Sequence, residues 1–494
     1  MTGSGGRTWV ARLVDDRRYP RTLFAAAVVF FLSFGLVRDY LYVLNAFDLG
    51  IFDQAVRHYA HLQAPIVTIK GDGYNIWADH FHPIIALWAP LYWLWDDVRV
   101  LLVRQALVMA SAAWPLWRFV RRHWTETATA WPKAFTALVL CAWPIQALAA
   151  FDVHEIAFAV PLLAFALDAL DRRAVRDLAL GCALLLLVRE DMGALVAVIG
   201  LVWLVWRGPA RRTRRDWVVG GALIATGLAA FVLITGVVIP HFAADGYQYW
   251  DYPDLGDTPG AALTTILTRP WRVLVLLFWP LVKTGTWLAL LGGLAFLPLR
   301  SPYALVALPI MAERMLAARE NLWHILGHYD APVWIILALA AVDGFGRLPE
   351  RWRTRLAPWR GTALIVAGAV SVALAALLFA WTPTSLAERP ARAAIVAWLP
   401  ADTCVAADNW LAAAFTHTNR VTVPGASEVR QDFYIVDLRQ PDRTITSGFW
   451  TAQQGYDHAL GLGFHEAYRA GALVILQAPD YAGPDPARCG PNAP

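Results

Sequence analysis

Side chains that can do acid–base chemistry and bind anions occur in four separate stretches of this sequence. They are Asp48, Asp53, Gln54, Arg57, His80 and His82; Asp152, His154 and Glu155; Arg189, Glu190 and Asp191; and Arg314, His328 and Tyr329. Carboxylates and imidazoles can take a proton from a reacting hydroxyl, and an arginine fork can bind a phosphate. We therefore predict one functional site to which all four stretches contribute.

The first stretch has structural alternatives beside catalysis. Asp48 could be the N-cap of a helix that begins at Leu49, because an Asp side chain accepts hydrogen bonds from the free N–H groups there. Asp53 and Arg57 are four residues apart, so on a helix they could form an ordinary surface ion pair of small energetic value. The same helix is predicted to be amphipathic and to lie flat with one stripe toward the membrane, formed by Ile51, Ala55 and Tyr59.

The remaining stretches keep alternatives open as well. The spacing of His80 and His82 suits metal chelation from an extended segment, whereas Pro83 could open a helix that His82 simply precedes. Polar residues such as Asp152 are normal at the boundary of a membrane span, and Tyr329 is a usual interfacial anchor. A structural role and a functional role are both compatible with these positions.

The composition places these residues in a membrane protein. Of 494 residues, 58% are hydrophobic and only 16% are charged, whereas a soluble protein carries roughly a quarter charged residues. Apolar blocks such as 23–37, 218–240 and 364–381 approach the length that a helix needs to cross the hydrocarbon core. The pattern excludes a soluble enzyme, a disordered chain and a nucleic-acid-binding domain, and it predicts an all-α polytopic membrane protein.

The arginines define a topology through the positive-inside rule. Five arginines in residues 1–21 predict a cytoplasmic N-terminus, and four later basic clusters are also cytoplasmic if residues 22–385 cross the membrane eleven times. The predicted spans are 22–43, 98–119, 131–150, 155–170, 177–189, 191–206, 216–240, 271–298, 301–317, 331–345 and 361–382. The candidate residues then lie at the outer ends of the spans, with the first outer loop at 44–97.

Two of these spans are too short to cross alone. We predict that 177–189 and 191–206 are broken or tilted helices forming a hairpin, with Arg189-Glu190-Asp191 at the joint. The alternative is one continuous helix of about 30 residues. Charge at this depth is tolerated where it faces protein or a water-filled cavity, although the three residues could also pair with one another.

Residues 386–494 have the pattern of a small α/β domain, which we expect outside the membrane. Strands are predicted at 403–408, 421–424, 432–438 and 473–477, with helices at 409–418 and 451–460 between them. Cys404 and Cys489 lie near the two ends of this domain. An oxidising compartment would allow a disulfide between them, with two free thiols as the alternative.

Motifs that would indicate other functions are absent from the sequence. It contains no Walker A loop, no GxGxxG after a strand, no HExxH and no GxSxG, and it shows no internal repeat typical of secondary transporters. Charges within the predicted spans are few, with Arg104 and Lys283 as the main exceptions. This distribution favours an enzyme over two alternatives that stay open: a transporter or flippase of a lipid-linked saccharide or anion, and a non-catalytic assembly protein.

Short motifs connect the candidate residues with a known family. They are Phe47-Asp-Leu-Gly-Ile-Phe-Asp-Gln54, His80-Phe-His-Pro83, Ala89-Pro-Leu-Tyr92, Phe151-Asp-Val-His-Glu155, Arg189-Glu-Asp191, His328-Tyr329, Thr403-Cys-Val-Ala-Ala-Asp408 and Asp432-Phe-Tyr-Ile-Val-Asp437. In these motifs the sequence resembles the bacterial integral-membrane family known as domain of unknown function 2079, from about residue 22 to 478.

That family is similar to the C-type superfamily of membrane glycosyltransferases, and the resemblance implies their chemistry. It implies inverting transfer of a hexose or pentose from a polyprenyl-phosphate-linked donor to an acceptor in the cell envelope, which is a glycan, lipid or protein. The expected location is the outer face of a bacterial plasma membrane. An acidic residue of the first outer loop serves there as base or metal ligand. The matching residue here is Asp48, with Asp53 as the second candidate, and this loop has no adjacent Asp-Glu or Asp-x-Asp pair.

Roles for the other candidates follow from this hypothesis. The leaving lipid phosphate would be bound by Arg189 and Arg314. A divalent ion, Mg²⁺ or Mn²⁺, would be held by His80, His82 and Asp48, or the sugar would be hydrogen-bonded by His80, His82 and His154. The sugar hydroxyls or the arginines would be oriented by Glu155, Glu190 and Asp191. Further substrate contacts are predicted for Gln54, Arg57, Asp152, His328 and Tyr329. The outer domain would cover the site, select the acceptor or be purely structural.

Overall fold

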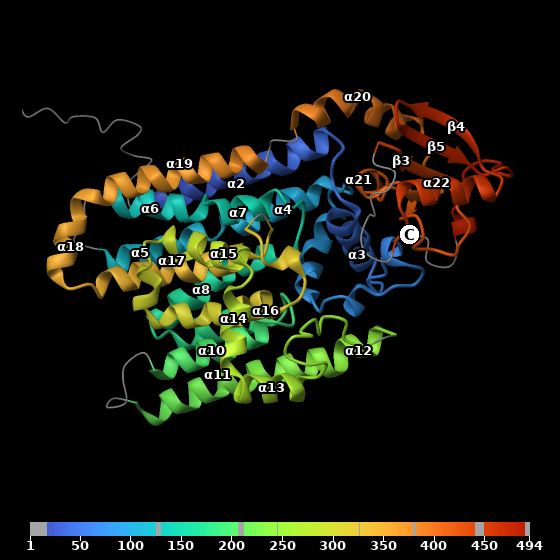
Figure 1. Cartoon of the computed structure of the whole chain (residues 1–494). Helices are drawn as coiled ribbons and strands as arrows, with labels where there is room; N and C mark the ends of the chain where they lie inside the picture. Colours follow the sequence, from blue (N-terminus) through green and yellow to red (C-terminus); the bar gives the residue numbers. More distant parts are fainter. Residues whose placement is uncertain are drawn as a thin grey trace, which may run out of the picture. The chain divides into compact units, whose positions relative to one another are not determined.

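The computed structural model describes residues 17–124, 130–205, 212–244, 246–325, 327–378, 382–439 and 449–489. The chain is mostly helical with a small C-terminal sheet, and it divides into two compact units (Figure 1). The helical unit comprises Met1–Phe31, Ala106–Ala150 and Glu155–Leu378. The sheet unit comprises Leu32–Gln105, Phe151–His154 and Phe379–Pro494. Helices α2 (Tyr19–Tyr40) and α4 (Arg99–Ala110) contribute residues to both units.

The helical unit is built around α17 (Asp330–Gly346), which is buried on all sides over most of its length. A helix that is apolar all round belongs in the interior, and α5, α6, α7, α8 and α15 pack around this one. The surrounding helices of the unit are α5 (Ala113–His123), α6 (Ala130–Leu140), α7 (Trp143–Ala149), α8 (Ala159–Asp171), α9 (Val175–Leu185), α10 (Met192–Val205), α11 (Arg214–Leu233), α12 (Ile239–Phe242), α13 (Pro259–Thr268), α14 (Pro270–Phe278), α15 (Leu281–Gly292), α16 (Leu308–Leu316), α18 (Glu350–Leu356) and α19 (Arg360–Leu378).

Helices α10 and α11 approach each other through glycines. A Cβ added to Gly193 would lie 2.6 Å from the carbonyl oxygen of Gly227, and one added to Gly200 would lie 2.7 Å from that of Gly220. Small residues seven positions apart on both helices therefore let the two backbones touch, as is usual where membrane helices associate.

Four helical stretches are long and apolar enough to cross a membrane: Tyr19–Tyr40, Arg99–His123, Ala130–Ala149 and Arg214–Phe242. Two bent pairs raise the number to six among the described residues, namely Pro259–Thr268 with Pro270–Phe278 and Asp330–Gly346 with Glu350–Trp359. The eleven predicted crossings also include shorter apolar helices, so their number and orientation stay predictions.

Two predicted spans differ from the structure. The expected span 271–298 is divided into α14 and α15 at Trp279-Pro280, because Pro280 has no N–H to continue the first helix. The stretch 177–206 is broken between α9 and α10 at residues 186–191, so the alternative of one continuous helix is wrong. This break places Arg189, Glu190 and Asp191 in a turn.

The sheet unit contains five strands in the order β2-β1-β3-β5-β4. They are β1 (Cys404–Ala407), β2 (Arg420–Thr422), β3 (Phe433–Asp437), β4 (His465–Ala470) and β5 (Leu473–Gln477). β1 pairs in parallel with β2 and β3, whereas β5 is antiparallel to β3 and β4. The central strands are buried because α20 (Thr382–Trp398) packs on β4 and β5 while α22 (Ala452–Gly461) packs on β3 (Figure 1). Strand β4 and helix α20 were not predicted.

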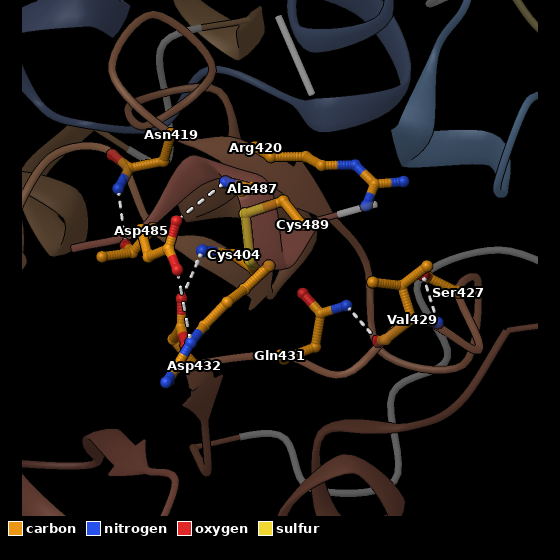
Figure 2. The surroundings of a disulfide bond; sticks show 12 residues. Cys404, Asn419, Arg420, Ser427, Val429, Gln431, Asp432, Asp485, Ala487 and Cys489 are labelled. Carbon is orange, nitrogen blue, oxygen red and sulfur yellow. Dashed lines mark hydrogen bonds and ion pairs between the residues drawn. A yellow bond between two sulfur atoms is a disulfide. The ribbon is translucent and has the colours of Figure 1, made fainter. Parts of the chain in front are cut away.

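The two ends of the C-terminal segment are joined covalently. Cys404 at the start of β1 and Cys489 in the turn η12 (Pro486–Cys489) form a disulfide with Cα atoms 5.3 Å apart (Figure 2). Asp432 lies beside it, and one of its carboxylate oxygens accepts a hydrogen bond of 3.0 Å from the Cys404 backbone N–H (Figure 2).

The sheet unit also contains the first loop. This loop forms η1 (Ala46–Gly50), α3 (Ile51–Ala60), η2 (Thr68–Lys70), η3 (Ile76–Ala78) and η4 (Pro83–Leu91). Asp72 in the loop accepts hydrogen bonds from the Arg420 guanidinium, the Ser427 hydroxyl and the Glu428 backbone N–H. Residues roughly 350 positions apart are thereby joined into one folded body.

Candidate functional site

Asp48 lies inside a single π-helical turn, η1, and does not cap a helix, so the N-cap alternative is wrong. The free N–H groups of Ala46 and Phe47 are instead capped by the Asn409 side-chain oxygen, at 3.0 and 3.4 Å. Asn45 donates its side-chain N–H to the Asp48 carboxylate at 3.3 Å. The Asp48 side chain is half-buried, so it is held in place while part of it reaches the surface. π-turns of this kind are frequent at functional sites.

Asp152 anchors the backbone next to that turn. It has a left-handed conformation with φ of 58°, and its buried carboxylate accepts hydrogen bonds from the Arg38 guanidinium and, at 2.6 Å, from the Asn45 backbone N–H. The Gln105 side chain bonds both the Asp152 carbonyl oxygen and the His154 backbone N–H. Because every one of these groups is satisfied by protein, Asp152 positions residue 45 and the turn after it.

Asp53 has a very different environment from Asp48. It is fully buried, accepts a hydrogen bond of 2.6 Å from the Tyr92 hydroxyl, and lies 3.5 Å from the Arg57 guanidinium. Arg57 also contacts Asp96 at 2.7 Å and His417 at 2.6 Å. The prediction of a surface pair between Asp53 and Arg57 is therefore wrong, because this is a buried polar network.

The electrostatics of this network follow from its burial. Burial first, and then the neighbouring Asp53 charge, raise the pKa of Tyr92 well above its ordinary value, so its hydroxyl stays a donor. Burial alone would lower the pKa of Arg57, but Asp53 and Asp96 outweigh it and raise that pKa. The network holds one cation between two carboxylates.

Helix α3 faces the interior of its own unit. Ile51 and Ala55 are buried within the protein, so the expectation that this stripe faces the membrane is wrong. Gln54 makes hydrogen bonds within the protein as well. Its side-chain amide donates to the Thr68 hydroxyl and the Val421 carbonyl oxygen, each at 2.9 Å. These contacts hold α3 to η2 and β2.

Two histidines of the sheet unit lie beside an aromatic ring. The rings of His82 and His154 lie 5.4 and 5.9 Å from that of buried Phe52. His82 directly precedes η4, whose first residue is Pro83, in agreement with the structural alternative for this position. His80 is half-buried.

Metal ligands are gathered in one place only within the described ranges. That group of three close ligand atoms is Cys404, Asp432 and Cys489, and both cysteines are used in the disulfide. His80, His82 and Asp48 do not form such a group there. A requirement for a divalent ion stays a prediction.

The helical unit holds a second group of candidate residues. In the turn between α9 and α10, Arg189 binds Asp191 through two hydrogen bonds of 2.8 and 2.7 Å. Glu155 and Glu313 are close enough to Arg189 to interact electrostatically, and Glu190 is buried in the same turn. Three carboxylates, those of Asp191, Glu155 and Glu313, thus interact with the Arg189 guanidinium, and the predicted internal pairing of Arg189 with Asp191 is present.

A loop packs beside these carboxylates. Burial, followed by the charges of Glu190 and Glu313, raises the pKa of Tyr247. The loop is fixed by Asp251, whose backbone oxygen accepts from the Ala318 N–H at 2.9 Å and whose carboxylate pairs with Arg319 at 3.1 Å. Nothing in the sequence pattern indicated that residues 246–258 would join this group.

The Arg314 side chain holds its own loop together through buried contacts within the protein. It is 2% exposed, pairs with fully buried Asp330 at 2.6 Å, and donates to the Leu322 carbonyl oxygen at 2.9 Å. The rings of His328 and Tyr329 are in contact just before α17, with centroids 3.9 Å apart and planes tilted by 43°. Arg314 closes the loop between α16 and α17, so its predicted role as a phosphate ligand has no support from its surroundings.

Sequence reasoning missed the partners that define these environments. Arg38, Asn45, Tyr92, Asp330 and Asn409 each contact a candidate residue or the backbone beside it. The sequence motif that contains Tyr92 did not indicate that its hydroxyl donates to Asp53. Asp330 follows Tyr329 directly, so its position at the start of a predicted span was the one available signal.

Comparison with solved structures gives distant similarities. The chain is 14% identical to ArnT from Cupriavidus metallidurans bound to undecaprenyl phosphate, with a TM-score of 0.49 over 93% of this chain and 99% of that one. It is 11% identical to the Archaeoglobus fulgidus oligosaccharyltransferase in the apo form, with a TM-score of 0.44 over 88% of this chain and 71% of that one. No curated protein sequence gives a significant match.

A family model gives a clear result. The model described as "Predicted membrane protein (DUF2079)" matches residues 38–458, which is most of the chain and includes both groups of candidate residues. The matched region contains the first loop, the turn at Arg189 and the strands β1 to β3. The chain therefore belongs to the DUF2079 family of predicted membrane proteins.

Proposed function

We propose that this protein is a membrane glycosyltransferase that moves a sugar from a polyprenyl-phosphate donor to an extracytoplasmic glycan, lipid or protein, with inversion. Asp48 is the proposed base that takes the proton from the attacking hydroxyl. The reaction is suggested by the resemblance of the DUF2079 family to the C-type glycosyltransferases. The observation that carries the assignment is the environment of Asp48.

A general base must reach its substrate. Among the three candidate carboxylates of the sheet unit, Asp53 and Asp152 are buried, and they accept hydrogen bonds from Tyr92 and Arg38, respectively. Asp48 is half-buried and is positioned by Asn45. Geometry thus favours Asp48 over Asp53 as the base.

A second role, binding of the donor, is proposed for the turn at Arg189. Asp191 occupies the Nε and Nη2 edge of the guanidinium, so the Nη1 edge is the one offered to a phosphate oxygen. Glu155, Glu190 and Glu313 supply acceptors for sugar hydroxyls. Carboxylates that accept from two adjacent hydroxyls also fix the orientation of the ring.

The test is transfer of labelled sugar from polyprenyl-phosphate donors by the full-length protein in nanodiscs. We expect Asp48→Asn to lower kcat by about 10²- to 10⁴-fold, the contribution of a positioned base, with an unchanged melting temperature. We expect Asp53→Asn to do the reverse. It should lower the stability by about 1–3 kcal/mol, because it disturbs a buried charge network, and change kcat only a few-fold.

The two isosteric variants serve as controls for each other. Loss of activity in Asp53→Asn at full stability, with Asp48→Asn active, would transfer the role of base to Asp53. Should no donor in a broad panel turn over while lipid-linked saccharide crosses liposomes that contain the protein, the protein is a transporter and the transferase proposal is wrong. Activity measured with and without a chelator tests the requirement for a divalent ion.

A further inference from the structure

The sheet unit contains a cavity of about 210 Å³ that the proposed base does not line. A single water needs a cavity volume of only about 10–15 Å³, so this cavity accommodates a small organic molecule. Its wall includes Asp39, Tyr42, Asp97, Arg99, Trp410 and His417. These residues come from the end of α2, the start of α4, and α21 (Asn409–Ala412) with the turn after it.

Charged groups are fixed on one part of this wall. Arg99 pairs with Asp39 at 2.9 Å and lies 3.7 Å from Asp97, whose carboxylate also accepts from the Arg99 backbone N–H at 2.8 Å. His417 is held by the Arg57 guanidinium at 2.6 Å. The cavity thus presents carboxylate acceptors and a guanidinium donor in a pre-arranged set.

The aromatic part of the wall is also held in place. Tyr42 has a left-handed conformation with φ of 52°, which costs energy for a residue with a side chain, and the Arg392 guanidinium binds its carbonyl oxygen at 2.7 Å. The Asp408 side chain caps α21 and accepts from the Trp410 backbone N–H at 3.1 Å, which fixes the backbone at Trp410. Residues held in strained conformations by their surroundings cluster at ligand sites.

We propose that this cavity binds a sugar ring of the acceptor, an inference that rests on the glycosyl transfer proposed above. Sugar hydroxyls donate to Asp39 and Asp97 and accept from Arg99, while the apolar C–H face of the ring packs on Trp410 and Tyr42. A sugar ring uses both carboxylates and the guanidinium, whereas inorganic phosphate could bind only to Arg99. A purely apolar ligand would cover these charged groups without offering them a hydrogen bond.

The cavity lies at the ends of two candidate membrane spans, which bears on the source of the sugar. Its polar wall lies where α2 ends at Tyr40 and α4 begins at Arg99, and both helices belong to candidate membrane spans. A saccharide carried on a lipid headgroup and the end of a free glycan share this recognition chemistry. The same cavity can therefore serve either source, and the assay must compare them.

Binding is measured first, without turnover. The probes are methyl glycosides of hexoses, pentoses and 2-amino hexoses, followed by saturation-transfer NMR on the full-length protein in nanodiscs, with inorganic phosphate as competitor. We expect Trp410→Ala and Asp39→Asn each to weaken sugar binding about tenfold, as loss of one stacking or charged contact does. The matched controls are Trp95→Ala and Asp457→Asn, two exposed residues outside the cavity wall.

Kinetics then separate this proposal from the transferase itself. Both cavity variants should raise the acceptor KM about tenfold with the donor KM unchanged, for lipid-linked and free saccharide acceptors alike or for one of them. Unchanged acceptor KM in active variants, or phosphate binding in place of sugar binding, would overturn the cavity assignment and leave the transferase intact. A wild-type protein that binds sugar but transfers none, together with cavity variants that no longer bind sugar, would support the cavity assignment and refute the transferase.

Discussion

At the scale of single residues, two aspartates five positions apart have environments that their spacing does not reveal. Asp48 is half-exposed in a π-turn, whereas Asp53 is enclosed with Tyr92 and Arg57. The difference comes from where the chain turns and from Asn409, which caps the N–H groups around Asp48. A carboxylate so placed keeps its access to a substrate, as a base requires.

Asp432 provides a prediction about pH. Burial raises the pKa of this carboxyl above its ordinary value, although the Cys404 N–H and the nearby Arg488 and Arg430 oppose the shift. The folded protein therefore holds this proton to higher pH than the unfolded chain does, so the contribution of Asp432 to stability falls as pH rises from about 4, the unfolded value, through the folded pKa. We expect the melting temperature of Asp432→Asn relative to wild type to rise over that window and then level off.

The measurement is a thermal unfolding series between pH 4 and 7.5. Asp457→Asn, at an exposed position of α22, is the control and should follow the wild type across the series. A difference between Asp432→Asn and wild type that shrinks as the pH rises would contradict the assignment, because it would mean that the folded protein favours the charged carboxylate.

The residue types of the site could be predicted from the sequence, but their partners could not. Acids and arginines at span ends stand out because charge is rare in this chain. Asp152 finds Arg38 at a separation of 114 residues, and Ala46 finds Asn409 at 363. Such pairings depend on how elements pack, which no local pattern encodes. The roles of Arg314 and Arg189 were distinguishable only once Asp330 and Asp191 were seen beside them.

At the scale of elements, the exposed segment before α4 is an apolar patch. Trp93, Leu94 and Trp95 are 66%, 82% and 45% exposed, a few residues before a candidate span begins at Arg99. Exposed Trp beside a span is typical of the membrane interface. We expect an environment-sensitive fluorophore on Leu94→Cys to report an apolar medium in nanodiscs.

The matched comparison for this experiment is Leu462→Cys. Leu462 is 55% exposed directly after α22 in the sheet unit, and a probe there should report water. Both variants are made in a Cys141→Ala background, because that thiol is only half-buried. Equal emission maxima at the two positions would refute an interfacial position for residues 93–95.

The elements themselves were predictable where burial produces a clear pattern. Strands β1, β2, β3 and β5 fall close to the predicted ranges because buried β-branched and aromatic runs mark them. Strand β4 was missed since its residues are largely exposed and polar, and only its pairing with β5 identifies it. Helix α20 was missed because it contains Pro390 and a polar face. The error at Pro280 is of another kind: a proline, which ends a helix, lies inside the span predicted at 271–298.

At the scale of the whole molecule, the disulfide closes the sheet unit. It joins residues 85 positions apart, and the chain-entropy model gives about 4–5 kcal/mol for a loop of that length. We expect Cys404→Ser with Cys489→Ser to lower the stability of this unit by up to that amount. The readout is the protease concentration that cleaves the C-terminal segment in nanodiscs.

The control is the double variant Cys141→Ala with Cys182→Ala, which removes the two free thiols and should leave protease resistance unchanged. Alkylation followed by mass spectrometry reports how many thiols are free in each protein. Wild-type protein that shows four alkylated cysteines, or a Cys404→Ser/Cys489→Ser variant as resistant as wild type, would contradict a stabilising disulfide.

The hydrogen bonds from Ala46 and Phe47 to Asn409 have a consequence for synthesis. The turn around Asp48 leaves the ribosome early, but the side chain that caps it is made 363 residues later. At about 5–20 residues per second, the turn waits roughly 20–70 s for its cap. During that interval the nascent protein carries the sequence of its proposed base without the fold that positions it. On the proposed assignment, activity therefore begins only after Asn409 has been made.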